Sequence, residues 1–324
     1  MLDLIQYREL FLTYLEKHPF EKSPVKLYEP VDYILSIGGK RMRPILTLMA
    51  CELFGGTPDK ALDAAMAVEV FHNFTLLHDD IMDDAPLRRS QQTVHEKWDV
   101  NTAILSGDVM MIQSYEFLLK YEGPELAKLL RVFNTTAIEV CEGQQMDVDF
   151  ESLTEVPLDS YLEMIKLKTS VLVACALKMG AIIAGADDNN AQLIYDFGLN
   201  LGLAFQLQDD YLDAFGDPKT FGKQVGGDII ENKKTFLYIE GLKMANAQQK
   251  TDLLNYFSST DMAQDLKVSE VKKLFKEIGV DQAILEEIQN YTSKALKVLD
   301  DLAMSDSSKK SLNEFANYLM KRSV

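Results

Sequence analysis

Two aspartate clusters, each near the end of an apolar stretch, constrain this chain more than any other feature. Asp79 and Asp83 are four positions apart, and Asp209 and Asp213 repeat that spacing. On a helix, each pair places two carboxylates on one face, a single turn apart. Like charges at this spacing repel each other, so a cationic group must offset the repulsion. A single cluster is most often a solvated helix end, whereas two matching copies indicate a shared site.

The composition favours one all-α domain over residues 1–324. The apolar fraction of 47% is ample for a large core, and the 17 glycines and nine prolines form no linker-like segment. Strand-type alternation is nearly absent, whereas helical periodicity recurs throughout. We therefore expect a helical bundle in which the two aspartate helices face each other across the interior, where bundles build their sites.

Charge and cysteine content exclude several classes of protein. A net charge of −17 leaves no basic surplus for phosphate contacts, so we expect no nucleic-acid partner. The three cysteines form no CxxC pattern, which is typical of a cytosolic protein. The first residues lack the pattern of a signal peptide. The longest apolar stretch, residues 171–186, is interrupted by Lys178 and is too short to span a bilayer, so we expect a cytoplasmic protein.

Periodicity, glycines and prolines predict the order of elements. We expect helices at about residues 3–18, 28–38, 44–54, 59–84, 99–121, 124–150, 158–185 and 188–215, followed by three or four more. Between them lie a basic loop at residues 40–43, a loop at 85–98 and a polar loop at 216–232. The aspartate clusters thus belong to the helices at 59–84 and 188–215.

Aspartates in this pattern suit Mg²⁺, which takes one or two carboxylates and leaves the rest of its shell to water and substrate phosphates. Basic residues near glycine or proline turns fit the same chemistry, because they can donate to phosphate oxygens. These residues are Lys40, Arg43, Arg88, Arg89, Lys223, Lys233 and Lys234. Any one set can be ordinary surface charge. Together with two acidic clusters, they indicate a site for metal and a phosphorylated substrate.

His72 belongs to a formal ExxH motif with Glu69, a pattern found in di-iron bundles. Such sites need two ExxH motifs and two further glutamates on four helices. None of the other three histidines has a glutamate three residues before it, so the di-iron interpretation fails. We expect His72 to be a core or pocket-lining residue. The aspartate clusters also lack the alternating ligands and glycine of an EF-hand.

At several points the chain resembles the trans-isoprenyl diphosphate synthases, also called polyprenyl synthetases. The matching segments are GGKRMRP at 38–44, LHDDIMD at 77–83, RR at 88–89, KT at 168–169, QLQDDYLD at 206–213, GDI at 227–229 and NK at 232–233. The resemblance runs in order from about residue 38 to 238, and the combination is highly specific. It implies the isoprenoid-synthase bundle with a central active-site cavity, usually as a homodimer.

This resemblance implies a prenyltransferase that joins isopentenyl diphosphate to an allylic diphosphate of C5 to C15, giving an all-trans C15–C20 product. Three Mg²⁺ ions, held jointly with the allylic diphosphate, would be bound by Asp79, Asp83 and Asp209. The other implied residues are Arg88, Lys168, Lys223 and Lys233 for the allylic diphosphate; Gly39, Lys40, Arg43, His72 and Arg89 for isopentenyl diphosphate; and Thr169, Gln206 and the Lys168 carbonyl for the carbocation.

Product length in this family depends on positions just before the first aspartate motif. Phe74 lies five residues before Asp79 and Thr75 lies four before it, an aromatic–small pattern that resembles enzymes with C15 to C20 products. At about 100° per residue, Thr75 lies within roughly 40° of the Asp79 direction, whereas Phe74 is about 140° away. Thr75 is therefore the direct candidate for the pocket floor. Phe74 either closes the side of the pocket or is ordinary core packing.

Two other functions share part of this pattern. A catalytically silent partner subunit usually loses aspartates or basic residues, but both clusters are intact here. A class I terpene cyclase shares the helical fold and the first motif. It does not need Lys40 and Arg43, and it typically carries an Asn/Ser/Glu-type second motif instead of a second DDxxD.

Overall fold

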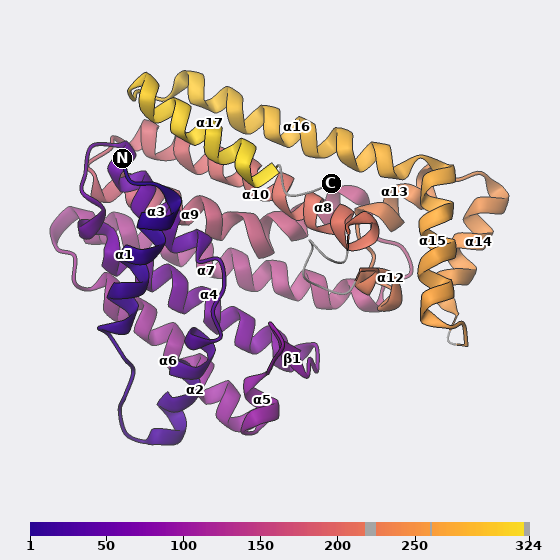
Figure 1. The fold of residues 1–324 in the computed structure, drawn as a ribbon, viewed down its shortest axis with the longest axis horizontal. Helices are drawn as coiled ribbons and strands as arrows, with labels where there is room; N and C mark the ends of the chain where they lie inside the picture. Colours follow the sequence, from indigo (N-terminus) through magenta and orange to yellow (C-terminus); the bar gives the residue numbers. More distant parts are fainter. Residues whose placement is uncertain (218–224, 260, 321–324) are drawn as a thin grey trace. The chain divides into compact units, whose positions relative to one another are not determined.

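The computed structural model describes residues 1–217, 225–259 and 261–320, and helices make up most of that part of the chain (Figure 1). The prediction of an all-α fold is confirmed. The helical elements are α1 (Leu4–Glu16), α2 (Val25–Ser36), α3 (Met42–Leu53), η1 (Pro58–Ala61), α4 (Leu62–Met82), α5 (Val94–Lys97), α6 (Val100–Leu118), α7 (Gly123–Ser152), α8 (Leu158–Ile165), η2 (Lys166–Ser170), α9 (Val171–Ile183), α10 (Asp188–Phe215), α12 (Gly227–Ile230), α13 (Phe236–Met244), α14 (Ala247–Ser258), α15 (Gln264–Ile278), α16 (Val280–Asp301) and α17 (Asp306–Met320).

Contacts between residues divide the chain into two compact units, each made of two segments. The first unit comprises residues 1–135 and 175–195, and the second comprises 136–174 and 196–324. Helices α7, α9 and α10 each contribute residues to both units. The prediction that residues 1–324 form a single domain stays a prediction.

Helix α4 is the core of the first unit. Of its 21 residues, 13 are buried, because apolar side chains surround it on nearly every side. It packs against α3 and α6, while α1 lies on α3 and α2 lies on α6. The aspartates therefore stand at the end of a helix whose direction is fixed by packing along its whole length.

The second unit is built on a separate apolar cluster. Its buried side chains come from α8, α10 and the helices α12 to α16, and include Leu207, Phe236 and Phe275. Helices α14 and α15 contact each other, as do α16 and α17, and Figure 1 shows both pairs side by side. This cluster fixes the face of α10 opposite to its partly exposed aspartates.

The structure differs from the predicted elements at several places, one of which is α12, inside the polar loop expected at 216–232. The helix expected at 158–185 is divided into α8, a π-helical segment and α9, and neighbouring helices approach that segment closely at Gly143 and Gly202. Helix α2 begins at Val25 and contains Pro30, since burial of its apolar face outweighs one lost backbone donor. The expected loop at 85–98 contains α5 and a small antiparallel hairpin of β1 (Leu87–Arg88) and β2 (Gln91–Gln92). Finally, five helices, rather than three or four, follow residue 232 in the described part of the chain.

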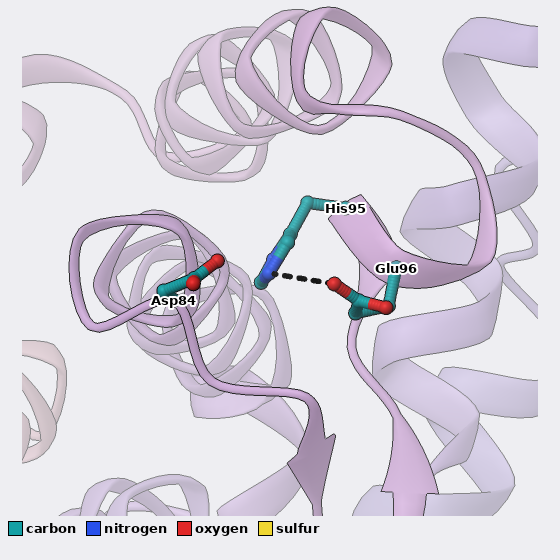
Figure 2. Close-up of side chains that lie close together, drawn as sticks. All are labelled: Asp84, His95 and Glu96. Atoms are coloured by element: carbon teal, nitrogen blue, oxygen red, sulfur yellow. Dashed lines mark ion pairs between the residues drawn. The ribbon is translucent and has the colours of Figure 1, made fainter.

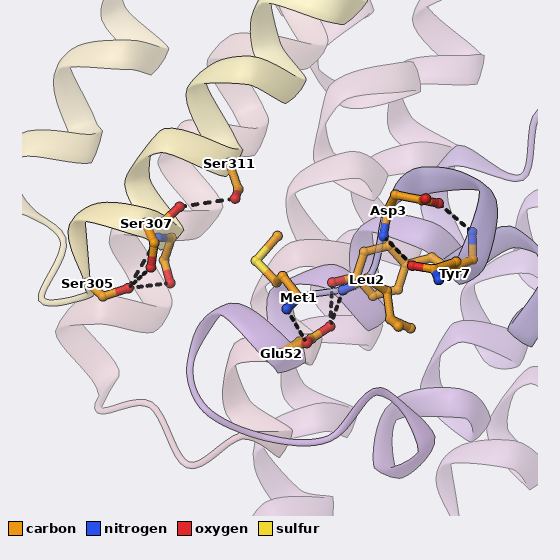
Figure 3. A network of polar contacts seen from close by, with 10 residues as sticks. Met1, Leu2, Asp3, Tyr7, Glu52, Ser305, Ser307 and Ser311 are labelled. Atoms are coloured by element: carbon orange, nitrogen blue, oxygen red, sulfur yellow. Dashed lines mark hydrogen bonds and ion pairs between the residues drawn. The ribbon is translucent and has the colours of Figure 1, made fainter.

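Polar contacts fix two helix ends, both drawn in Figure 3. In the first unit, the Glu52 carboxylate accepts hydrogen bonds from the Tyr7 hydroxyl at 2.7 Å and the Leu2 N–H at 3.1 Å. In the second, Ser305 precedes α17 and its Oγ accepts a hydrogen bond from the Ser308 N–H at 3.2 Å, which is an N-cap arrangement. Within the described residues, no helix combines the length and the apolar character needed to cross a membrane.

Candidate active site

The first aspartate motif lies at the carboxyl end of α4. Asp79 is partly exposed and Asp83 is exposed, whereas Asp80 is only 2% exposed. Arg88 binds Asp80 from the hairpin: its Nε donates to both carboxylate oxygens at 2.8 and 2.9 Å, and its Nη2 lies 2.7 Å from Oδ1. Burial raises the pKa of Asp80 and Arg88 opposes that shift. The carboxylates that reach solvent are thus those of Asp79 and Asp83, on the face that the four-residue spacing predicted.

A Schellman turn ends α4 and sets the direction of the chain that carries Arg88. The Ala85 N–H donates to the Asp80 carbonyl at 3.0 Å, and the Asp84 N–H donates to the Ile81 carbonyl at 3.3 Å. Asp84 takes the left-handed conformation that this turn requires, with φ of 47°. Aspartate tolerates that conformation better than most residues.

The basic loop before α3 is anchored by Arg41, a residue the sequence analysis did not assign to the site. Arg41 is buried, forms an ion pair with Glu69 on α4 and donates to the Leu35 carbonyl. The Asn73 amide also donates to Glu69 Oε1, at 3.1 Å. Glu69 is therefore used in holding the loop, which explains the ExxH spacing without a di-iron site.

Arg43 and His72, predicted to bind one substrate together, are in contact. Arg43 Nη1 lies 3.0 Å from His72 Nε2. Burial, followed by the charges of Arg43 and Arg89, holds the pKa of His72 well below its usual range. A neutral imidazole accepts the hydrogen bond from Arg43. Burial also lowers the pKa of Arg43 to about 10, and its Nε is buried without a hydrogen-bond partner.

Arg89 joins this cluster from the hairpin. Its guanidinium donates to the Gly38 carbonyl, and it lies so close to Gly39 that a Cβ there would be 2.6 Å from Arg89 Nη1. Burial lowers the pKa of Arg89, and the nearby Arg41 lowers it further. Gly39 is required both for this approach and for its φ of +126°. Lys40 is exposed beside it. The cationic side chains of Arg43 and Arg89 thus lie near each other, and a bound anion such as a diphosphate would reduce the repulsion between them.

The two candidate product-length residues lie on different sides of α4. Phe74 is buried, with its ring 5.5 Å from that of Phe71 and 4.8 Å from that of His78. His78 Nε2 lies 3.3 Å from the Ile104 carbonyl on α6, so this side of α4 faces α6. Thr75 is partly exposed, on the helical face that also carries His72 and Asp79. These contacts favour core packing for Phe74 and leave Thr75 as the candidate floor.

The second motif, on α10 in the second unit, repeats the exposure pattern of the first. Asp209 and Asp213 are partly exposed and Asp210 is 4% exposed. The Tyr161 hydroxyl donates to Asp210, and burial followed by the charge of Asp228 raises the pKa of Asp210 well above its usual range. The Asp228 N–H donates to Asp213 Oδ1 at 3.0 Å. In both motifs the middle aspartate is buried against a partner from another element, and the outer two reach the surface.

Lys168 and Thr169 lie in the π-helical segment between α8 and α9. Two glycines allow neighbouring helices to approach it: a Cβ on Gly143 of α7 would lie 2.3 Å from the Lys168 nitrogen, and one on Gly202 of α10 would lie 2.8 Å from Ser170 Cα. Wide turns of this kind occur frequently at functional sites. The expected continuous helix at 158–185 hid this feature.

Polar contacts connect that segment to the second motif. Lys168 Nζ lies 2.5 Å from Asp147 Oδ2. The Thr169 hydroxyl donates to Gln206 Oε1 at 3.3 Å, and Gln206 Nε2 donates to Asp210 Oδ1 at the same distance. The three predicted catalytic residues therefore lie within one unit, and Thr169 and Gln206 are in direct contact.

The remaining predicted lysines follow α10. Lys233 is exposed, forms an ion pair with Glu231 at 2.9 Å, and borders a small cavity that Asp210, Asp213 and Asp228 also line. Lys223 lies outside the described residues. The cavity places Lys233 beside the second aspartate motif.

A family model described as polyprenyl synthetase matches residues 24–278, most of the chain. The chain belongs to the polyprenyl synthetase family. It is 35% identical over 302 residues to the geranylgeranyl diphosphate synthase of Sulfolobus acidocaldarius, covering 92% of this chain and 91% of that one. A crystal structure of a geranylgeranyl pyrophosphate synthase is similar over the full length of both chains, with 54% identity and a TM-score of 0.96. That of the Corynebacterium glutamicum geranylgeranyl pyrophosphate synthase, complexed with isoprenyl diphosphate and magnesium, is 26% identical with a TM-score of 0.87, covering 99% of this chain and 100% of that one.

Membership of the polyprenyl synthetase family confirms the predicted fold class and the predicted enzyme class, a trans-prenyltransferase. The roles assigned to individual residues stay predictions. The partners of the two middle aspartates, Arg88 for Asp80 and Tyr161 for Asp210, were not predicted from the sequence. The identical DD spacing of the two motifs was the only available signal, and it does not reveal partners far away in sequence.

Proposed function

We propose that this polyprenyl synthetase condenses isopentenyl diphosphate with an allylic diphosphate of C5 to C15 and releases an all-trans product of C15 to C20, with geranylgeranyl diphosphate as the main product. The observation that carries the proposal is the repeated motif, in which two exposed or partly exposed carboxylates flank a buried, partnered one. The names of the related proteins support the product length.

The donors of both motifs fit Mg²⁺. Asp79, Asp83 and Asp209 offer only carboxylate oxygens, the hard ligands that this ion prefers. When bound, Mg²⁺ would supply Lewis-acid stabilisation of the departing diphosphate. We infer three ions held jointly with the allylic substrate, and a cytoplasmic homodimer as the working form, as the family resemblance implies.

The chain's own residues divide the remaining tasks. Arg43, Arg89 and the neutral His72, with Lys40 beside them, bind isopentenyl diphosphate and orient its double bond. Breaking the allylic C–O bond leaves the electron pair of that bond on the diphosphate. The departing diphosphate is bound electrostatically by Lys168 and Lys233, together with Arg88 and Lys223. Three groups face the resulting carbocation: the side chains of Thr169 and Gln206, and the Lys168 carbonyl. The double bond of isopentenyl diphosphate then forms the new C–C bond, and loss of one proton restores neutrality at carbon.

Product analysis tests the proposal directly. Purified protein is incubated with Mg²⁺, isopentenyl diphosphate and each allylic diphosphate of five, ten and fifteen carbons, and the products are sized by mass spectrometry. We expect prenyl diphosphates that each require isopentenyl diphosphate, and none when Mg²⁺ is chelated. A hydrocarbon released from an allylic diphosphate alone would identify a terpene cyclase instead. No product without a second protein would identify a partner subunit.

A further inference from the structure

His95, on the short helix α5, is buried without any hydrogen-bond partner. Its side chain is 4% exposed, and neither Nδ1 nor Nε2 has a partner. Buried polar atoms in native proteins are nearly always satisfied, because each one left unpaired loses the hydrogen bond it made to water. Two unsatisfied nitrogens on one ring indicate that a group absent from the chain itself satisfies them.

Two exposed carboxylates stand beside this ring. Figure 2 shows the imidazole directed into the space between Asp84 and Glu96. His95 Nε2 is 3.9 Å from Glu96 Oε1, and one ligand atom from each of the three residues lies within 4.8 Å of the others. At 3.9 Å the nitrogen and oxygen are too far apart for a hydrogen bond. Two atoms bound to a common ion at about 2.1 Å can be up to about 4.2 Å apart. The three ligand atoms would have to move closer together by on the order of 1 Å to bind one ion, and the exposed carboxylates are free to make that movement.

The backbone that carries these residues is fixed from both sides. Asp84 is held in the Schellman turn that ends α4. Thr93, just before α5, donates through its hydroxyl to the Ala85 carbonyl at 2.7 Å and through its N–H to the Pro86 carbonyl at 3.2 Å. These contacts bring the start of α5 against the end of α4. The three side chains are therefore placed together by backbone hydrogen bonds rather than by attraction between exposed acids.

We propose that Asp84, His95 and Glu96 form a binding site for a divalent transition-metal ion such as Zn²⁺ or Mn²⁺. An imidazole nitrogen with two carboxylate oxygens suits these ions, whereas Mg²⁺ prefers oxygen ligands alone. The site differs from the proposed Mg²⁺ ligands Asp79, Asp83 and Asp209, which are all carboxylates. The His72 ring, on the same face of α4 as Asp79, is in contact with Arg43. A bound ion would join the two ends of the segment that carries Arg88 and Arg89, and would restrain the hairpin.

Nitrogen coordination distinguishes this site from the aspartate motifs. The probe is Mn²⁺ added at substoichiometric and then equimolar amounts to the full chain without diphosphate, followed by pulsed electron paramagnetic resonance. We expect ¹⁴N modulation from a coordinated imidazole. His95→Gln should abolish it. The matched control His78→Gln should retain it, because His78 packs against α6 and takes no part in the site.

The exposed ligands give variants that do not disturb the core. Asp84→Asn and Glu96→Gln should each weaken Zn²⁺ binding, measured by calorimetry, by at least about tenfold, since even outer-shell changes cost 10–100-fold. Asp59→Asn, which alters an exposed carboxylate of η1, should leave the affinity unchanged. Absence of ¹⁴N modulation in the wild-type protein would overturn the proposal. So would modulation that survives His95→Gln, or an affinity for Zn²⁺ that both carboxylate variants leave unchanged. If His95→Gln fails to fold, as circular dichroism would show, the two carboxylate variants decide the question.

Discussion

Arg88 binds Asp80 through three contacts. Its Nε donates to both carboxylate oxygens at 2.8 and 2.9 Å, and its Nη2 lies 2.7 Å from Oδ1. Asp80 is buried while Arg88 is partly exposed. The pair therefore neutralises the middle carboxylate of the first motif and fixes the hairpin beside the proposed metal face. It also explains how an acid can be tolerated in the core at the end of α4.

Breaking this pair should show strong coupling between its members. Asp80→Asn should reduce the free energy of unfolding by about 1.5–3 kcal/mol, because it removes the charge that Arg88 binds. Arg88→Ala should cost a similar amount or more, since it leaves a buried carboxylate without its partner. The double variant should be less destabilised than the sum of the two, by about 0.5–3 kcal/mol in urea denaturation without metal. Simple additivity would show that the pair does not act as a unit.

Removing one proposed metal ligand should reduce turnover without unfolding the protein. Asp79→Ala is expected to slow product formation by roughly 10²–10³-fold at saturating Mg²⁺, because part of the leaving-group stabilisation is lost. Circular dichroism should stay unchanged, since Asp79 is only partly buried. Asp59→Ala, at an exposed position of η1, serves as the control. Wild-type turnover in Asp79→Ala would refute the metal assignment.

The two diphosphate sites should respond differently to loss of one guanidinium. Arg43→Ala should raise the KM for isopentenyl diphosphate by at least about tenfold, because a charge-assisted contact to phosphate is worth about 1.5–3 kcal/mol. The KM for the allylic substrate should change much less. Steady-state kinetics with each substrate varied in turn measures both values, and Arg8→Ala on the exposed side of α1 provides the control. Equal effects on the two KM values would contradict separate sites.

Thr75 and Phe74 should give different outcomes when substituted. Thr75→Phe should shorten the product, since the added ring lies on the face that carries Asp79. Phe74→Ala should lower the free energy of unfolding by about 3–5 kcal/mol, because the ring packs between Phe71 and His78. Mass spectrometry of the products and thermal denaturation of both variants separate these effects. A longer product from a stable Phe74→Ala variant would restore Phe74 to the pocket wall.

Glu52 should stabilise the first unit in a pH-dependent manner. Burial raises the pKa of Glu52, but hydrogen bonds from Tyr7 and the Leu2 N–H, together with the nearby Met1 ammonium, outweigh that effect, so its pKa in the folded protein is lowered. A carboxyl with a lowered folded pKa contributes stability above its unfolded pKa of about 4.3, and that contribution is lost as the pH falls.

Glu52→Gln should therefore cost about 1–3 kcal/mol near pH 7 and progressively less below about pH 4. Urea denaturation of wild type and variant across that range measures the difference. Glu16→Gln, an exposed position on α1, should show no such dependence. A difference that stays constant from pH 7 to pH 3 would contradict the assignment.

The sequence by itself determined the helical architecture and the faces that carry the aspartates. Helix α10 spans residues 188–215, as its periodicity predicted, and α4 ends at the first motif within two residues of the expected position. These features depend on neighbours three and four residues apart, so the local pattern contains nearly all the information. The family resemblance also assigned Arg43 and His72 to one substrate, and the structure shows these two side chains in contact.

Only the tertiary structure decided which groups satisfy one another. Arg88 binds Asp80, Tyr161 binds Asp210, and Arg41 takes the glutamate of the ExxH motif, although nothing in the spacing of these residues pairs them. The π-helical turn at Lys168 lies against the backbones of α7 and α10, and this close approach is possible because Gly143 and Gly202 have no side chain. The cost of leaving a buried charge unpaired is met by residues distant in sequence, and their positions depend on how the helices pack.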